Sequence, residues 1–438
     1  MPVNKISELI DFIQTKNEQI FVNIEKCNLS DSPDWYFDKD LGEIRNQDGS
    51  FFQIKALKKY KENQCVLEQP IIIQNEIGFL GIICCEIEGE MHYLMQAKIE
   101  PGNINNIQIS PTIQATKSNF TQKHGGKKPN YLDYFLNVEK ENIIVDQIQS
   151  EQSSRFYKKR NRNIIIKVDS PIEALENFRW MTLAQIKELM KYDNLINMDT
   201  RTVLSCIPAQ HMQKMGKIND EALLNSINYQ ESQNTFNTIC HYLNNVKMFN
   251  DDDIKIMPLD SLEGWTITDR EIVCNKPYSF KVVFCNIEIE GREVRNWTQP
   301  LFEATGQATF GLFTCVDEGV RKFLIKTTPE VGCFDSIELG PTIQREYINE
   351  DKLNDIDLLF DQKVKEGKNI KFNTVLSEEG GRFYHEENRN IIIEINKNEI
   401  KNLPEGYFWA DYKTLNHFVS INNCLNIQLR NLLSVLEW

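Results

Sequence analysis

The sequence repeats itself once, and this repetition limits the possible folds more than any other feature. Residues 150–166 read SEQSSRFYKKRNRNIII and residues 377–393 read SEEGGRFYHEENRNIII, so 11 of 17 positions are identical at an offset of 227. Average residue frequencies predict about one such identity. A second match, PTIQ, recurs in the same order at 111–114 and 341–344, an offset of 230. Colinear matches of this kind predict a duplicated domain.

These colinear matches divide the chain into four parts. We predict an N-terminal helix within residues 1–29, a first repeat at 30–207, a helical linker at 208–257 and a second repeat at 258–438. Each repeat contains strand-length segments rich in β-branched residues, such as NIIIKV and NIIIEI. Thr182 with Gln185, and Asp411 in the second repeat, are typical of helix starts. The expected fold class is α+β, with a mostly antiparallel sheet and flanking helices in each repeat.

Composition excludes several classes of protein. The net charge of −14 makes a nucleic-acid partner improbable, because phosphates require a cationic surface. The longest uncharged apolar stretch, near 77–85, is far shorter than the ~20 residues of a membrane helix. The N-terminal segment lacks the continuous apolar core of a secretion signal. We therefore expect a cytoplasmic protein without a membrane partner.

Neither a metal site nor a bound redox cofactor is expected. The eleven cysteines contain no CxxC pair and lie mostly in apolar segments, which predicts reduced core thiols. The six histidines, at positions 92, 124, 211, 241, 385 and 417, show no metal-ligand spacing. Glycine-rich phosphate or dinucleotide loops are also absent from the sequence.

A repeated Arg-Phe-Tyr motif is the strongest candidate for a ligand site. Strand alternation should send Phe156 to the core and place Arg155 with Tyr157 on the opposite face. Arg382 and Tyr384 repeat the pattern in the second half. Each copy also carries a following arginine, and these are Arg162 and Arg389. Two guanidinium groups beside a phenol suit a diphosphate, because their forks bind phosphate oxygens in bidentate fashion.

An alternative for these arginines is local pairing on the surface, with Glu151 or Glu378 as partners. Their repetition in both halves favours the ligand site. The copies have nevertheless diverged, since the positions that correspond to the cations at 158–160 of the first copy are His385, Glu386 and Glu387 in the second. The first copy is thus better equipped to hold an anion, and the second has more groups that transfer protons.

Other polar and aromatic residues recur in both halves. Gln69, Gln114, Trp297, Gln299 and Gln344 either recognise a nucleobase or sugar, or hydrogen-bond the backbone of loops near proline turns; the sequence leaves both open.

Two further motifs also permit a structural or a functional role. Trp180 is better explained as a core anchor than as a stacking platform. Residues 197–206 predict a capped helix in which Asp199 and Arg201 either pair with each other or face a ligand.

Several long stretches resemble one known family. They are QAKIEPGN (96–103), SPTIQATKSNF (110–120), NMDTRTVLSC (197–206), GREVRNWTQPL (291–301), ELGPTIQ and both Arg-Phe-Tyr segments. They resemble the nucleotide-diphosphate-hexose 2,3-dehydratases of deoxysugar biosynthesis over nearly the whole chain. The resemblance implies a tandem duplication of a Nudix-hydrolase-like domain at 30–207 and 258–438, a homodimer, and a nucleotide-diphosphate sugar as ligand.

The reaction that the resemblance implies needs no hydride carrier. Its usual substrate is dTDP-4-keto-6-deoxyglucose, whose ketone acidifies the proton on C3. A base removes that proton, the C2 hydroxyl leaves as water, and the enol becomes a 3,4-diketo-2,6-dideoxy sugar. The site must supply a base, a proton donor and a group that stabilises the enolate. We therefore expect the protein to need no cofactor.

The resemblance also suggests roles for individual residues. In the first copy, Arg155, Arg160 and Arg162 would hold the diphosphate, while Tyr157, Glu151 and Lys98 would transfer protons and stabilise the enolate. The corresponding set in the second copy is Arg382, Arg389, Tyr384, Glu378, Glu379 and His385. The cations of the first copy slightly favour it as the working site.

Two other functions compete with this prediction. A Nudix-type hydrolase would share the fold, but its magnesium-binding pattern of glutamates is missing from the sequence. A non-catalytic nucleotide-sugar-binding protein is disfavoured by the retention of both Arg-Phe-Tyr motifs.

Overall fold

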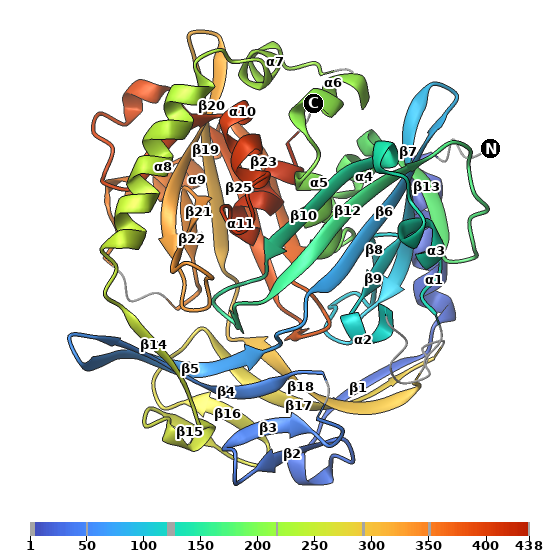
Figure 1. Ribbon diagram of the computed structural model, residues 1–438, viewed down its shortest axis with the longest axis vertical. Coiled ribbons are helices and arrows are strands. Elements are labelled where there is room, and N and C mark those ends of the chain that lie inside the picture. The colour runs from blue at the N-terminus through green and yellow to red at the C-terminus, as the bar shows by residue number, and fades with distance from the viewer. Residues whose placement is uncertain are drawn as a thin grey trace.

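The computed structural model describes residues 5–49, 51–120, 128–215, 218–290, 294–348 and 352–436. Of the features discussed above, His124, the start of the GREVRNWTQPL run at 291–293 and residues 216 and 217 of the linker lie outside these ranges. The fold is α+β with two tandem repeats, as predicted, and most strand pairs are antiparallel. Each repeat forms one small and one large sheet (Figure 1).

The two large sheets have seven strands each and the same topology. In the first repeat the strands are β6 (Gly78–Ile87), β7 (Glu90–Ile99), β8 (Ile107–Ser110), β9 (Ile113–Ala115), β10 (Ile143–Ser150), β12 (Arg160–Val168) and β13 (Phe178–Thr182). In the second they are β19 (Thr309–Asp317), β20 (Val320–Pro329), β21 (Ile337–Pro341), β22 (Ile343–Arg345), β23 (Ile370–Ser377), β25 (Glu387–Glu394) and β26 (Tyr407–Asp411). One pair in each sheet is parallel, β12 with β6 and β25 with β19.

The small sheets exchange a strand between the repeats. The first contains β2 (Trp35–Asp38), β3 (Glu43–Asn46), β4 (Gln53–Lys61), β5 (Gln64–Ile73) and β11 (Phe156–Tyr157), and the second β15 (Trp265–Ile267), β16 (Glu271–Cys274), β17 (Phe280–Ile289), β18 (Asn296–Ala304) and β24 (Phe383–Tyr384). Strand β1 (Val22–Lys26), which precedes the first repeat, pairs with β17, and β14 (Asp253–Met257), which precedes the second, pairs with β4. The repeats are therefore interlocked.

Helices cover the sheets and connect the repeats. They are α1 (Ile6–Gln19), α2 (Lys117–Phe120), α3 (Leu132–Leu136), α4 (Leu183–Leu189), α5 (Met198–Ser205), α6 (Ala209–Met215), α7 (Glu221–Ile227), α8 (Ser232–Met248), α9 (Asp355–Glu366), α10 (Tyr412–Val419) and α11 (Ile427–Ser434). The start signals are confirmed, since Thr182 and Gln185 form a capping box at α4 and Asp411 caps α10. Among the described helices, none has both the length and the apolar character needed to span a membrane.

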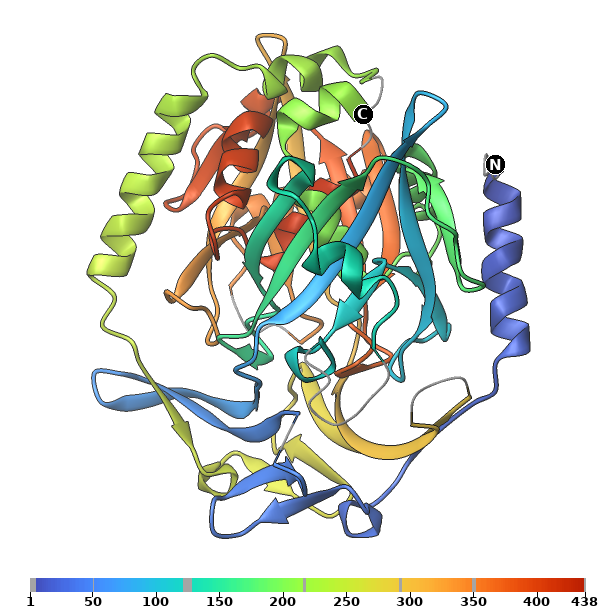
Figure 2. The same ribbon diagram turned by 45° about the vertical axis from the view of Figure 1, so that its right-hand side comes forward.

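Two cores hold the repeats together. Helices α5 and α11 pack against each other and each against its own large sheet, with Val203, Leu204, Leu429 and Leu432 in one shared cluster. The small sheets share a second cluster of buried side chains. Both ribbon views place these two sheets together at the other end of the molecule (Figures 1 and 2). All eleven cysteines are free thiols, but only six are buried and Cys65 is exposed, so the predicted core location holds for part of the set. Polar residues that face this shared interior therefore come from both repeats.

Candidate active centres

Two buried polar clusters lie where the repeats meet, and each combines residues of both. The first centre contains Lys98, Glu100, Gln114, Glu151, Lys159, Asn197 and Asp199 of repeat 1 with Glu379 and Arg382 of repeat 2. The second centre contains the equivalent positions, Thr328, Glu330, Gln344, Glu378, Glu386, Asn426 and Gln428 of repeat 2 with Gln152 and Arg155 of repeat 1.

Each Arg-Phe-Tyr turn reaches the opposite repeat by docking on a glycine. The amide of Gly102 donates to the carbonyl of Gly380 at 2.6 Å, and the carbonyl of Gly102 accepts from the amide of His385 at 2.8 Å. Gly332 makes the same two contacts with Ser153 and Lys158, both at 2.8 Å. A Cβ atom on Gly102 would lie 1.6 Å from the carbonyl oxygen of Phe383. Only glycine permits this approach.

We expect a Gly102→Ala variant to lose stability and activity together. The added methyl group meets backbone rather than a movable side chain, so the turn must shift, at a cost of about 1–3 kcal/mol in the free energy of unfolding. Denaturant unfolding measures this loss, and Gly264→Ala serves as control because its Cβ would meet only the carboxylate of Glu68, at 3.1 Å. Equal stability of the two variants would contradict the docking role.

A chain of hydrogen bonds links several residues of the first centre. Gln114 donates to Oε1 of Glu100 at 2.6 Å and accepts from Asn197, the N-cap of α5, at 3.3 Å. Nζ of Lys98 lies 3.2 Å from the same Glu100 oxygen. The second centre repeats the chain with Glu330, Gln344 and Asn426, but has no lysine. Each chain connects a strand end to the helix behind the centre.

The two docking arginines differ in charge compensation. Arg382 stacks on the ring of Phe52 at 4.3 Å and donates to the neutral side chain of Gln74 at 3.3 Å. Arg155 stacks on Phe280 at 4.2 Å but forms an ion pair with Glu346 at 3.4 Å. Direct contacts therefore neutralise the positive charge of Arg382 less than that of Arg155.

Burial changes the protonation of the first centre. Desolvation and the nearby carboxylate of Glu100 raise the pKa of Glu379 to about 7. Burial likewise raises the pKa of Glu151 to about 7. The pKa of Asp199 lies well above its ordinary value, because this side chain is buried and faces Glu151 and Glu379. Desolvation lowers the pKa of Lys159 to about 8. The centre thus holds groups that titrate near neutral pH.

The second centre has fewer cations beside its carboxyl groups than the first. Burial and neighbouring carboxylates raise the pKa of Glu330 and of Glu386 to about 8. Burial also raises the pKa of Glu378, and it brings the pKa of Glu338, which accepts from the hydroxyl of Ser150, to about 7. Glu330 and Glu386 therefore keep a proton at pH 7.

Lowering the pH from about 8 to about 6 is expected to raise the melting temperature. The carboxyl groups with a pKa raised to about 7 or 8 are Glu151, Glu330, Glu338, Glu379 and Glu386. In an unfolded chain such groups titrate near about 4.3. Their contribution to stability is therefore complete below that value and is lost as the pH rises through 7 to 8. Lys159 opposes this trend as a single group.

Thermal unfolding followed by circular dichroism at constant ionic strength measures this dependence. A Glu330→Gln/Glu386→Gln variant should flatten it, because amides do not titrate. A wild-type melting temperature that increases from pH 6 to pH 8 would contradict the raised pKa values.

Five of the sequence-predicted residues meet in the first centre, and they are Lys98, Gln114, Glu151, Glu379 and Arg382. Three others, Arg155, Glu378 and Gln344, lie in the second. The structure thus separates Arg155 from Lys98 and Glu151, with which the sequence had grouped it. The prediction that Phe156 is buried is confirmed, but Arg155 is equally buried, at 2% exposure, because it enters the other repeat.

The remaining predicted arginines contact protein groups other than those that form the two centres. Arg162 makes two 2.7 Å hydrogen bonds to Asp146, and Arg389 donates to Asn373 at 3.0 Å. Arg160 stacks over a phenylalanine ring at 4.1 Å. The surface pairing of Arg162 is of the kind that the alternative prediction described, with a different carboxylate.

Arg201 is fully buried and donates to backbone carbonyls of both repeats. Its partners are the carbonyl oxygens of Ile196, at 2.8 Å, and Ser377, at 2.7 Å. These bonds replace the hydrogen-bonded pair with Asp199 that one prediction considered.

The predicted aromatic residues have structural surroundings. Tyr157 packs beside the small-sheet cluster of Leu57 and Ile71. Tyr384 stacks with His385 at 4.2 Å. Trp180 lies in a hydrophobic cluster, and its indole donates to a backbone carbonyl at 3.1 Å. Burial lowers the pKa of His385.

The predicted glutamines near proline turns support the docked turns. Gln69 donates to the carbonyl of Ser154 at 2.7 Å, and Gln299 donates to that of Gly381 at 2.8 Å. The indole of Trp297 donates to Gln299 at 2.9 Å. These contacts favour the backbone-supporting role over recognition of a nucleobase.

Sequence reasoning did not single out Glu100 and Glu330 as site residues. The signal was present, because the offset of 230 that relates the two PTIQ motifs also relates Glu100 to Glu330 and Gly102 to Gly332. The sequence left the role of Asp199 open between local pairing and a ligand site, since its neighbours in the centre come from distant segments.

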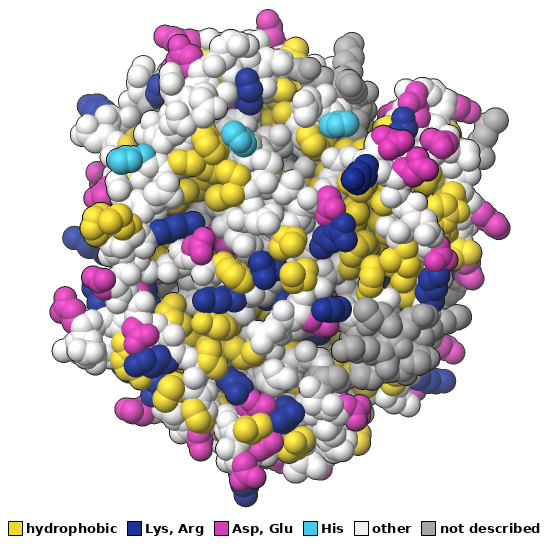
Figure 3. Space-filling view, viewed as in Figure 1, with side chains coloured by type: hydrophobic (Ala, Val, Ile, Leu, Met, Phe, Trp, Pro, Cys, Tyr) yellow, Lys and Arg dark blue, Asp and Glu magenta, His cyan; other side chains and the backbone are white. Residues whose placement is uncertain are grey.

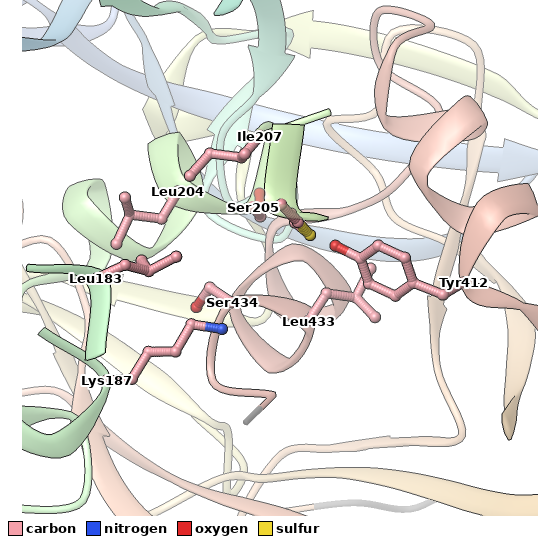
Figure 4. Close-up of a pocket in the computed structure, with 9 residues that line it drawn as sticks. Leu183, Lys187, Leu204, Ser205, Ile207, Tyr412, Leu433 and Ser434 are labelled. Atoms are coloured by element: carbon pink, nitrogen blue, oxygen red, sulfur yellow. The ribbon is translucent and has the colours of Figure 1, made fainter. Parts of the chain in front are cut away.

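Two cavities lie away from these centres. One of about 10 Å³ between α4, α5 and α11 is lined by Lys187, Ser205, Tyr412 and Ser434 (Figure 4), and is large enough for a single water molecule at most. A groove of about 430 Å³ lies beside β14, next to Tyr60. Lys and Arg side chains also gather across the middle of the molecule, over the junction of large and small sheets (Figure 3).

Comparison with known proteins identifies relatives over the whole chain. The profile of a family described as NDP-hexose 2,3-dehydratase matches residues 6–207 and 236–436. A protein of Saccharopolyspora spinosa is 35% identical, covering 92% of this chain and 85% of its own length. Proteins of Streptomyces violaceoruber (34%; 94% and 92%) and Amycolatopsis orientalis (32%; 97% and 89%) are similar. Each carries the name dTDP-4-dehydro-6-deoxy-alpha-D-glucopyranose 2,3-dehydratase.

Proposed function

We propose, from the premise that the chain belongs to the NDP-hexose 2,3-dehydratase family, that it removes water from a dTDP-4-keto-6-deoxyhexose. The C4 ketone makes the C3 proton acidic. A base takes this proton, the electron pair forms the enolate, and the C2 hydroxyl leaves as water after protonation. The remaining enol converts to the 3,4-diketo-2,6-dideoxy sugar, still attached to the nucleotide.

We assign the reaction to the first centre, on one observation. Where the first centre has Lys98, Glu379 and Asp199, the second has Thr328, Gln152 and Gln428. An amide cannot transfer a proton as a carboxyl group does, and a threonine carries no charge. The second centre is in this respect a natural variant of the first, without its acid, its base and its cation.

The protonation of the first centre supports a division of roles. Glu379, half-buried and with a pKa of about 7, is suited to remove the C3 proton, because a base works best near the operating pH. Burial raises the pKa of Asp199 well above its ordinary value, which suits this group to donate a proton to the leaving hydroxyl. The ammonium group of Lys98 would stabilise the enolate oxygen. Arg382 and Lys159 would balance the charge of the diphosphate.

Replacing these groups should abolish turnover. We expect Glu379→Gln, Asp199→Asn and Lys98→Thr each to lower kcat by about 10²–10⁴-fold, because each converts the first centre towards the second. The assay follows formation of the diketo product with a trapping reductase. The paired controls, Glu378→Gln and Glu386→Gln in the second centre, should retain most of the activity. Loss of turnover in the controls alone would transfer catalysis to the second centre.

Binding should depend on the nucleotide. We expect dTDP to raise the melting temperature more than UDP, GDP or CDP at equal concentration, because stabilisation grows with affinity. A thermal-shift panel measures this preference, and Arg382→Gln should reduce the response to dTDP. A larger response to any other nucleotide would contradict thymine as the nucleobase of the substrate.

The same assay separates the competing functions. Release of a free nucleoside phosphate without dehydration would indicate a hydrolase. Stabilisation by dTDP-4-keto-6-deoxyglucose without turnover would indicate a binding protein. Dehydrated product supports the proposal.

We also propose that each repeat is Nudix-hydrolase-like and that the protein works as a cytoplasmic homodimer. The support is the family membership together with the paired large sheets. Light scattering coupled to size exclusion tests the dimer, since a mass near 51.2 kDa would indicate a monomer.

A further inference from the structure

We propose that Arg201 is a positioning residue for the acid and base of the first centre. This inference rests on the proposed function, because it takes Asp199 as the acid and Glu379 as the base. Arg201 would act through the protein, without touching the substrate.

Arg201 connects the two segments that carry these groups. It lies on α5, two residues after Asp199, and is 1% exposed. One end of its guanidinium donates to the carbonyl of Ile196, just before α5 begins, at 2.8 Å. The other end donates at 2.7 Å to the carbonyl of Ser377, two residues before Glu379. A single guanidinium group thus joins the helix that carries the acid to the strand end that leads to the base.

Further contacts hold the same two segments in place. The hydroxyl of Ser377 donates to Oε1 of Gln108 at 2.8 Å, so the strand end is held on two sides. At the other end, Asn197 caps α5 and also donates to Gln114, which binds Glu100. These bonds hold the segments on both sides of the first centre, and Arg201 supplies a charged bond between the repeats.

The charge of Arg201 is suited to this task. Burial lowers its pKa to about 10, whereas Glu378 and Asp199 favour the charged form. The guanidinium therefore remains protonated at neutral pH and keeps its donors. A planar fork loses less freedom per hydrogen bond than a lysine ammonium would, so it fixes the separation of the two segments well.

The second repeat provides a matched control. Arg430, on α11 two residues after Gln428, is also fully buried and donates to the carbonyl of Ser150, two residues before Gln152. It makes the equivalent bond between repeats and also donates to the hydroxyl of Thr202 on α5, whereas the side chains that it would position in the second centre, Gln152 and Gln428, are amides. Removal of either guanidinium should therefore cost similar stability, with different consequences for turnover.

The experiment compares Arg201→Gln, Arg201→Lys and Arg430→Gln in the full-length protein. Melting temperatures should fall by similar amounts in the two glutamine variants. Below these temperatures, Arg201→Gln should lower kcat about 100-fold, because a displacement near 1 Å between reacting groups can have this effect, while KM and dTDP binding stay close to wild type. Arg430→Gln should keep kcat within about tenfold of wild type. Arg201→Lys should recover part of the lost kcat.

Each other outcome has a distinct meaning. A raised KM with unchanged kcat in Arg201→Gln would make Arg201 a substrate-binding residue and overturn the inference. Equal losses of kcat in the two glutamine variants would mean that Arg201 has only a general role in folding. That result would also overturn the inference. If Asp199→Asn is inactive while Arg201→Gln is fully active, this inference fails and the proposed function stands. If Asp199→Asn is itself fully active, the role of Asp199 as the acid fails, and this inference fails with it. Wild-type protein that forms no dehydrated product would instead contradict the proposed function.

Discussion

The docking of each Arg-Phe-Tyr turn on a glycine of the opposite repeat is the constraint on which both centres depend. At Gly102 and Gly332 the backbones approach so closely that no Cβ atom fits, and two backbone hydrogen bonds fix each turn. The approach carries a guanidinium into the other repeat, where it stacks on an aromatic ring. A charged side chain is buried favourably only if such partners compensate its lost hydration. Neither centre is complete within one repeat.

Duplication explains why one molecule contains two similar centres with different chemistry. The shared architecture needs both arginines, both glycines and both hydrogen-bonded chains to the helix caps, and these are present twice. The groups that transfer protons are not needed for that architecture, so they were free to diverge. The exchanged strands β1 and β14 keep the repeats interlocked, which preserves the geometry of one centre while the other changes.

Much of the fold could be predicted from local patterns. The β-branched strands, the capping box at Thr182 and the cap at Asp411 depend on neighbouring residues, and all three predictions are confirmed. The grouping of site residues depended on which repeat a turn contacts, a property that no local pattern contains. Arg155 was therefore grouped with Glu151, although they lie in different centres. Glu100 was recognisable only through its spacing from Glu330.

The sequence by itself determined the duplication, the α+β class, the strands and helices of each repeat, and the membership of a known family. These follow from periodicity, composition and repeated motifs, which act over short distances along the chain. Only the tertiary structure decided that the repeats exchange strands and turns, and that Asp199 and Glu379 share one centre. The physical reason is that such contacts depend on which surfaces can pack together and bury charge at an acceptable cost in hydration. That outcome depends on the whole folded chain and on no single segment.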